Sequence, residues 1–306
     1  MDSDERLGFL VTGGAEGSFC LLKLDIEPRS HKKDLLLIKR FRLTKLEAAV
    51  AMPEADFNIQ SVALGPNRIV VGTRSGALYE QEISETKNSG LKVWLKCTDD
   101  SLLKSIDFDM FSTRLYLLSL SGLFMVQALH SLDTVFRHPF NQPAISVISL
   151  KTTERVLVIL ETLIAGFSYH PKKDLYELDA HLRLEAKGII QTAKLSPNEQ
   201  ILALSTLAGN APVIEMYLVR KGLEYIRPLY GFTSSVVHLD FSVDSFYLHC
   251  EEANGNFLFY EIETRTVFNT ETIDFDIEFL RDGVRREEKI KSVHNFYGNN
   301  NEMQQI

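Results

Sequence analysis

The chain lacks the features that mark several protein classes. Its three cysteines, Cys20, Cys97 and Cys250, are too few and too far apart for a disulfide framework or a thiolate metal site, so free thiols in a reducing compartment are expected. The longest apolar runs, such as Val156–Leu160, are strand-sized and far below the ~20 residues that cross a bilayer. The acidic N-terminal segment, residues 1–6, contains no apolar signal sequence. The sequence therefore predicts a cytosolic protein without membrane insertion.

An excess of positive charge is also missing. The net charge of −8 gives no basic field for a nucleic acid, so no nucleic-acid partner is expected. Charge is unevenly spread, however: in residues 29–45 seven cations stand against Asp34 alone, a local net charge of +6. A second, mixed cluster occupies residues 281–291. The candidate partner-binding residues come from these two segments: Lys32, Lys33, Lys39, Arg40, Arg42, Lys45, Arg281, Arg285 and Arg286.

The sequence does contain a repeat. Five segments share one plan, in which an apolar strand, a tight turn, a second apolar strand, a turn with Gly or Asn and a third strand follow one another. They are Gln60–Ile83, Lys104–Leu129, Ile145–His170, Gln191–Val219 and Val237–Ile262. A period of ~40–45 residues with four strands per unit is typical of the blades of a WD-repeat β-propeller. With no long amphipathic helix in the chain, an all-β fold is predicted.

More polar segments follow each unit and fit a fourth strand at the outer edge of a blade, where charge discourages edge-to-edge pairing. They are Asp34–Leu43, Leu91–Lys96, Asp133–Phe140, Leu175–Leu184, Leu223–Leu229 and Thr264–Asn269.

The two ends of the chain look incomplete. Leu10–Phe19 resembles a second and third strand without a first, and Ile273–Leu280 alternates like a first strand without followers. We therefore predict a propeller of six blades over residues 1–280, five complete and one split between the termini, which would remove the open edge. Residues 281–306 are predicted to be a polar tail or docking segment. The alternative is that the chain is part of a larger ring completed by another polypeptide.

Patterns that would indicate catalysis or cofactor binding are missing. The polar residues of the predicted first strands show no repeated carboxylate at one depth, and hydrogen bonds to neighbouring turns are the favoured role for Asp107 and Asp240. These residues are Asp107, Asp109, Ser149, Lys194 and Asp240. Gly13–Gly17 leads into a strand rather than a helix, which favours a hairpin turn over a phosphate loop. The histidines show no metal-ligand spacing. We therefore expect no enzyme activity and no cofactor.

Two stretches resemble the echinoderm microtubule-associated protein-like family. In Asn58–Gly76 the similar residues are Ser61-Val62-Ala63-Leu64-Gly65 followed by Ile69-Val70-Val71-Gly72-Thr73. In Ser235–Ser245 they are His238-Leu239-Asp240-Phe241-Ser242, with the aromatic strand Phe257–Ile262 after them. The dipeptides Trp-Asp and Gly-His, which usually mark the repeat, do not occur. Family members typically carry two joined propellers, so the resemblance covers part of such a protein.

This resemblance implies a non-enzymatic propeller scaffold on microtubules, in the cytoskeleton of the cytoplasm and especially of cilia or the axoneme. Its partners would be tubulin, microtubule-associated proteins or other ciliary proteins. Because tubulin surfaces are acidic, the basic segment 29–45 is the candidate contact. The alternative is a general cytosolic adaptor in trafficking or ubiquitin-ligase complexes.

Overall fold

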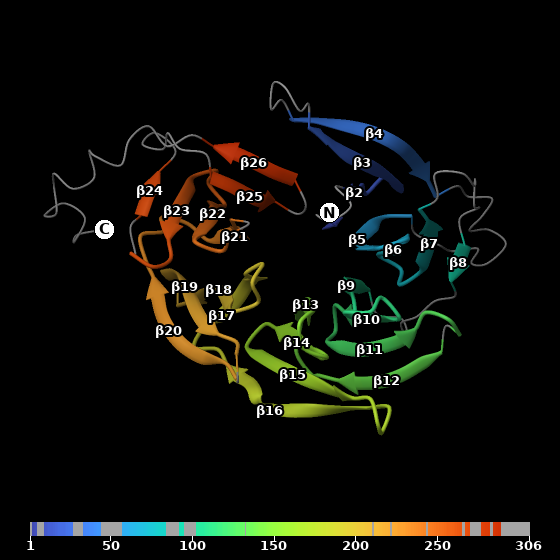
Figure 1. The fold of residues 1–306 in the computed structure, drawn as a ribbon. Helices are drawn as coiled ribbons and strands as arrows, with labels where there is room; N and C mark the ends of the chain where they lie inside the picture. Colours follow the sequence, from blue (N-terminus) through green and yellow to red (C-terminus); the bar gives the residue numbers. More distant parts are fainter. Residues whose placement is uncertain are drawn as a thin grey trace, which may run out of the picture. The chain divides into compact units, whose positions relative to one another are not determined.

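The protein consists of strands throughout the part of the chain that can be described. The computed structural model describes residues 2–4, 9–26, 33–43, 57–83, 92–94, 102–131, 133–209, 211–220, 222–242, 244–264, 267–269, 277–281 and 284–288. These residues form six four-stranded sheets and one two-stranded sheet (Figure 1). They contain no helix, and hence none that could cross a membrane. The all-β prediction is confirmed.

In each four-stranded sheet the strands follow one another in chain order. The first sheet contains β1 (Asp2–Asp4), β2 (Phe9–Gly13), β3 (Ser18–Ile26) and β4 (Lys33–Arg42). The second contains β5 (Ile59–Gly65), β6 (Arg68–Thr73), β7 (Leu78–Glu82) and β8 (Lys92–Trp94). The third contains β9 (Leu103–Phe108), β10 (Arg114–Ser119), β11 (Leu123–Ala128) and β12 (Thr134–Pro139).

The remaining sheets repeat this order. The fourth contains β13 (Ala144–Leu150), β14 (Arg155–Leu160), β15 (Leu163–His170) and β16 (Leu175–Glu185). The fifth contains β17 (Ile189–Leu195), β18 (Ile201–Ala208), β19 (Ala211–Leu218) and β20 (Glu224–Leu229). The sixth contains β21 (Val236–Phe241), β22 (Tyr247–Glu252), β23 (Phe257–Glu261) and β24 (Val267–Asn269). The two-stranded sheet contains β25 (Ile277–Arg281) and β26 (Val284–Glu288).

The chain forms two compact units. The first comprises residues 1–160 and 167–178, and the second comprises residues 161–166 and 179–306. Within the first unit, β5 lies beside β9 and β9 beside β13. Within the second unit, β17 lies beside β21. In both units the neighbouring sheets thus meet along their first strands.

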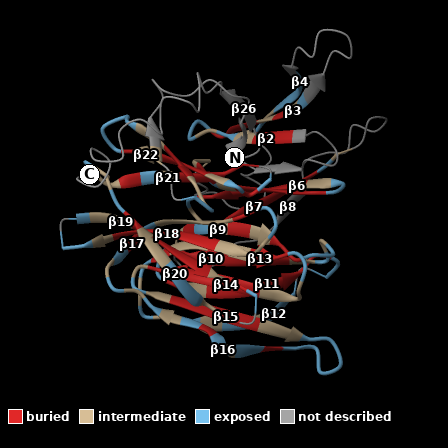
Figure 2. Cartoon of the chain, turned by 60° about the vertical axis from the view of Figure 1, so that its left-hand side comes forward, coloured by how far each residue is buried: buried red, intermediate tan, exposed pale blue. Residues whose placement is uncertain are grey.

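Burial follows the position of a strand in its sheet (Figure 2). The second strands β6, β10 and β14 are apolar runs buried at every position but the first, as expected for strands covered on both faces. Packing between sheets is close here, because a Cβ added to Gly72 on β6 would lie 2.1 Å from Cδ2 of Leu103. The fourth strand β12 is exposed or half-buried along its whole length. The predicted polar outer strand Asp133–Phe140 is therefore confirmed.

The N-terminal sheet is complete rather than split. Its first strand is β1, in which Ser3 lies opposite Leu10 of β2. The C-terminal strand β25 pairs instead with β26, in a hairpin that spans residue 280, the predicted domain boundary. The prediction that Ile273–Leu280 completes the N-terminal sheet is therefore wrong, although six four-stranded units are confirmed. The sequence did not predict β1, because its residues are all polar and show no apolar alternation. They can still form a strand, since backbone hydrogen bonds do not need apolar side chains.

Candidate functional site

Asp107 on β9 and Asp109 in the turn after it both accept hydrogen bonds from backbone N–H groups, although that of Asp107 comes from a strand and not from the predicted turn. Oδ2 of Asp107 accepts a hydrogen bond from the backbone N–H of Ser149 on β13 at 2.7 Å, which joins two neighbouring sheets. Oδ1 of Asp107 forms an ion pair of 2.8 Å with Nζ of Lys151. Asp109 accepts hydrogen bonds from the backbone N–H groups of Thr113 and Arg114, at 2.6 and 2.8 Å. It thereby fixes the β9–β10 turn.

Asp240 and Lys194 form an ion pair between two neighbouring first strands. Asp240 on β21 is 0 % exposed, and its Oδ1 lies 3.2 Å from Nζ of Lys194 on β17. The side chain of Lys194 keeps 31 % of its surface exposed. A fully buried carboxylate needs such a cation, because desolvation of an isolated charge is costly.

The described residues include no group of three or more His, Cys, Asp or Glu side chains arranged for a metal ion. Gly13–Gly17 contains the β2–β3 turn, in which Gly17 has a φ of +78° and donates to the carbonyl of Gly14 at 3.0 Å, so the predicted hairpin is confirmed. Cys250 is a buried free thiol whose pKa is raised by burial, and Cys20 is a half-buried free thiol. Cys97 lies outside the described residues.

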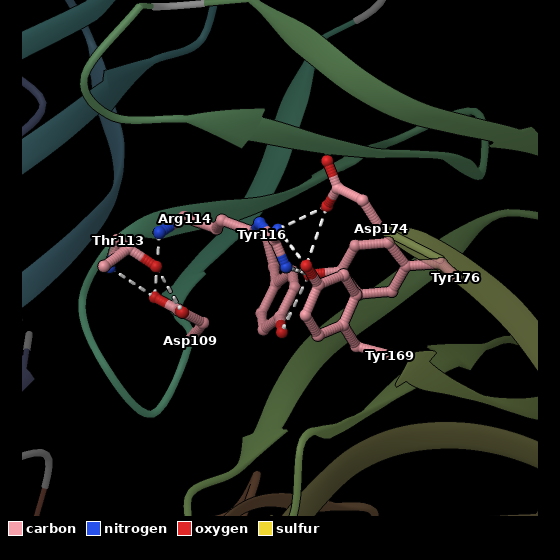
Figure 3. Close-up of polar contacts among 7 residues, drawn as sticks. All are labelled: Asp109, Thr113, Arg114, Tyr116, Tyr169, Asp174 and Tyr176. Atoms are coloured by element: carbon pink, nitrogen blue, oxygen red, sulfur yellow. Dashed lines mark hydrogen bonds and ion pairs between the residues drawn. The ribbon is translucent and has the colours of Figure 1, made fainter. Parts of the chain in front are cut away.

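An arginine–tyrosine cluster lies where the β9–β10 turn meets the β15–β16 hairpin (Figure 3). The guanidinium carbon of Arg114 stands 3.8 Å from the ring centroid of Tyr169, a cation–π distance. Nη2 of Arg114 lies 2.7 Å from Oδ1 of Asp174 and also donates to the Tyr169 hydroxyl. Nη1 donates a longer hydrogen bond of 3.4 Å to the Tyr176 hydroxyl. One cation thus connects β10 to β15, to β16 and to the turn between them.

Burial and hydrogen bonds set the protonation of this cluster. Burial raises the pKa of Tyr116, which is 2 % exposed, and of Tyr176, so both hydroxyls stay protonated. The Tyr176 hydroxyl donates to the Tyr116 hydroxyl at 3.4 Å. Burial alone would lower the pKa of Arg114, but hydrogen bonds to Tyr169 and Tyr176 outweigh it, and the pKa is raised. Arg114 therefore keeps its positive charge, next to the carboxylate of Asp174.

A cavity of about 240 Å³ opens beside the cluster. Besides Arg114 and the tyrosines, its lining includes Met110, Phe111, Glu154 and Arg155. Phe111 is 62 % exposed and Met110 37 % exposed, although both are apolar. Aromatic, Met and Arg side chains are enriched at protein–protein interfaces. The composition of this cavity suits a side chain from a protein partner.

The sequence predicted no part of this cluster. Its residues come from β10, β15, β16 and their turns, and only Arg114 has counterparts at the start of other second strands, Arg68 on β6 and Arg155 on β14. A weak signal was present in Arg114 itself, a cation directly before the buried run Leu115–Leu118, because a charge at the end of such a run needs a partner. The sequence near Arg114 does not indicate which residue this partner is, because Asp174 lies 60 residues away along the chain.

The predicted basic residues fall into two groups. Lys39, Arg40 and Arg42 are exposed along β4, and Lys33 begins this strand. Lys32 and Lys45 lie outside the described residues. Arg281 ends β25, while Arg285 and Arg286 on β26 lie opposite Leu280 and Phe279 in the backbone register. The structure therefore aligns three predicted cations, Lys39, Arg40 and Arg42, on one exposed strand.

Solved structures share this fold at low sequence identity. No protein-family model matches the chain, and no curated protein matches its sequence. The β-propeller domain of Cps50 (Swd1) from Myceliophteria thermophila is similar with a TM-score of 0.64 and 10 % identity, over 93 % of this chain and 85 % of that one. The C-terminal WD40 domain of Sif2 is similar with a TM-score of 0.59 and 13 % identity, over 85 % and 68 %.

A chain of the mitotic checkpoint complex is also similar, with a TM-score of 0.60 and 12 % identity over 83 % of this chain and 73 % of that one. The protein therefore has the WD40-type β-propeller fold with six blades, as predicted. At these identities the likeness shows the fold alone.

Proposed function

We propose that this protein is a non-enzymatic propeller scaffold that associates with microtubules, in the cytoplasm and especially in cilia or the axoneme. The fold supports the role of a platform, since one solved chain with the same fold is part of the mitotic checkpoint complex. The observation that carries the microtubule proposal is the basic strand β4, with Lys39, Arg40 and Arg42 exposed along it. Residues Asn58–Gly76, which contain β5 and β6, resemble the echinoderm microtubule-associated protein-like family, and this resemblance also supports the proposal.

The exposed charges of β4 are opposite in sign to the net charge of the whole protein. The chain carries −8, yet β4, the last strand of its sheet, exposes three cations, with Arg40 and Arg42 on one face and Lys39 on the other. Arg40 forms an ion pair with an acid of the β2–β3 turn, since its Nη2 lies 3.8 Å from Oε1 of Glu16. Both of these side chains are more than half exposed, so this contact neutralises little of the local field. Such a stripe attracts an acidic protein surface over about 8 Å at physiological salt.

The cavity beside Arg114 favours a second candidate, the cytosolic adaptor of trafficking or ubiquitin-ligase complexes. An exposed aromatic side chain next to a permanently charged arginine is the composition of an interaction hot spot. This candidate predicts that partner binding depends on Phe111 and is indifferent to the charge of β4. Substitutions on the two surfaces therefore distinguish the candidates. A microtubule scaffold should lose partner binding when the charge of β4 changes, and an adaptor should lose it when Phe111 is replaced.

Reversing the charge of β4 tests the microtubule proposal. For the triple variant Lys39→Glu, Arg40→Glu and Arg42→Glu, we expect microtubule affinity to fall by about ten-fold or more, since each reversal replaces an attraction by a repulsion. Co-sedimentation with microtubules at two salt concentrations measures this, and the wild-type affinity should fall as salt rises.

The matched control reverses three other exposed cations, Lys172, Arg183 and Lys187, and gives the same change in net charge. It should bind as the wild type does. Unchanged binding of the β4 variant would reject this strand as the contact, and equal losses in both variants would show that only total charge matters.

A further inference from the structure

Strand β4 has an open edge. It is 10 residues long, lies at the end of its sheet, and pairs along one side with β3. None of the other strands that the structure describes pairs with its second side. An open edge of this length offers a row of backbone N–H and C=O groups to an incoming strand.

The register shows which backbone groups face this edge. In an antiparallel pair, positions alternate between those that bond the partner strand and those that point away from it. The N–H of Leu43 donates to the carbonyl of Gly17 at 2.8 Å, and Phe41 and Lys39 follow as bonded positions opposite Phe19 and Leu21. The N–H and C=O groups of Arg40 and Arg42 therefore point to the open edge.

The side chains of β4 combine apolar surface with one sign of charge. Leu37 is 58 % exposed and Ile38 51 % exposed, at the point where the register with β3 shifts. Arg40 and Arg42, two positions apart, share a face of the strand. Cations along an edge discourage pairing with a second copy, because like charges would meet, but they favour a strand that carries carboxylates.

We propose that β4 accepts an acidic, extended segment of a partner protein, which adds to the N-terminal sheet as a fifth strand. Backbone hydrogen bonds from Arg40 and Arg42 hold the segment, carboxylates at alternate positions face their side chains, and apolar side chains cover Leu37 and Ile38. This proposal rests on the proposed function, in which the cations of β4 make the contact, and it adds the mode of binding and the chemistry of the bound segment.

A proline at position 40 separates this mode from simple charge attraction. Arg40→Pro removes the outward N–H without breaking a β3–β4 hydrogen bond, and proline is tolerated at such positions of edge strands. Arg40→Ala removes the same side chain but keeps the N–H. The probe is a fluorescent decapeptide of alternating glutamate and threonine, followed by anisotropy. We expect Arg40→Pro to bind about five-fold more weakly than Arg40→Ala, the loss of one hydrogen bond.

Hydrogen exchange provides the second readout. On addition of the peptide, exchange of the Arg40 and Arg42 amides should slow markedly, whereas the Lys39 and Phe41 amides are already bonded to β3. Melting temperatures of both variants establish that they fold. If Arg40→Pro does not fold, Arg42→Pro and Arg42→Ala near the strand end replace the pair.

Equal peptide affinities of the proline and alanine variants, or no slowing at these two amides, would overturn strand addition while leaving charge-dependent microtubule binding intact. Slowed exchange together with microtubule binding that ignores the charge of β4 would support strand addition and reject the microtubule proposal. A matched lysine–threonine decapeptide should not bind, and its binding would reject the requirement for an acidic segment.

Discussion

Lys194→Met is expected to lower the free energy of unfolding by about 3 kcal/mol, because it removes the cation from a fully buried carboxylate. Asp240 is 0 % exposed, and its Oδ1 lies 3.2 Å from the ammonium of Lys194. Methionine keeps most of the stem of Lys194 and its packing, so the loss measures the charge rather than the volume. Urea unfolding measures the change, through a shift of the midpoint at constant slope.

The double variant Lys194→Met, Asp240→Leu is the matched control. It replaces both charges by apolar groups, and replacement of a buried ion pair in this way is often neutral or stabilising. We expect it to regain most of the lost stability. If the double variant is as unstable as Lys194→Met alone, the cost comes from packing at β17 and β21 and not from the buried charge.

The spacing of apolar strands and turns predicted the repeated unit of the fold well. Buried runs such as Leu115–Leu118 on β10 and Val156–Leu160 on β14 carry a local pattern, and reversals such as that at Gly76, where φ is +83°, need glycine. Both signals lie within a few residues of the structure that they determine. They therefore gave the strand order of the five sheets that follow the N-terminal one, and a total of six four-stranded sheets.

The ends of the chain could not be predicted in the same way. The strand β1 consists of Asp2, Ser3 and Asp4, and β26 consists of Val284 and four charged residues. Their membership of a sheet depends on the backbone groups of a neighbouring strand, which no side-chain pattern records. The hypothesis of a split blade was wrong for this reason. It required an apolar first strand for the N-terminal sheet, and the only unassigned segment with that pattern was Ile273–Leu280.

The sites show the same limit. The basic segment was visible because its charges are adjacent along the chain, and the structure places Lys39, Arg40 and Arg42 on one strand. The ion pair of Asp240 and the cluster around Arg114 join residues 46 to 62 positions apart. Such pairs form when sheets pack against each other. A single sequence therefore shows the charged residues but does not show which residue each of them contacts.

Arg114→Ala is the second substitution from which we expect a loss of about 3 kcal/mol in the free energy of unfolding. It removes the cation–π contact with Tyr169, the ion pair with Asp174 and the hydrogen bond to the hydroxyl of Tyr176. It also leaves a hole between β10 and the β15–β16 hairpin, because the side chain of Arg114 is only 17 % exposed. Thermal and urea unfolding measure the loss.

Two control variants separate the contributions to this loss. Arg114→Lys should remain destabilised by more than half as much, because an ammonium cannot reproduce the planar fork that reaches three partners. Asp174→Asn should cost less than about 1 kcal/mol, since Asp174 is 68 % exposed and its ion pair is screened by water. Full rescue by lysine would show that the cluster needs only a charge. A loss in Asp174→Asn equal to that in Arg114→Ala would place the stabilisation in the ion pair rather than in the contacts with the tyrosines.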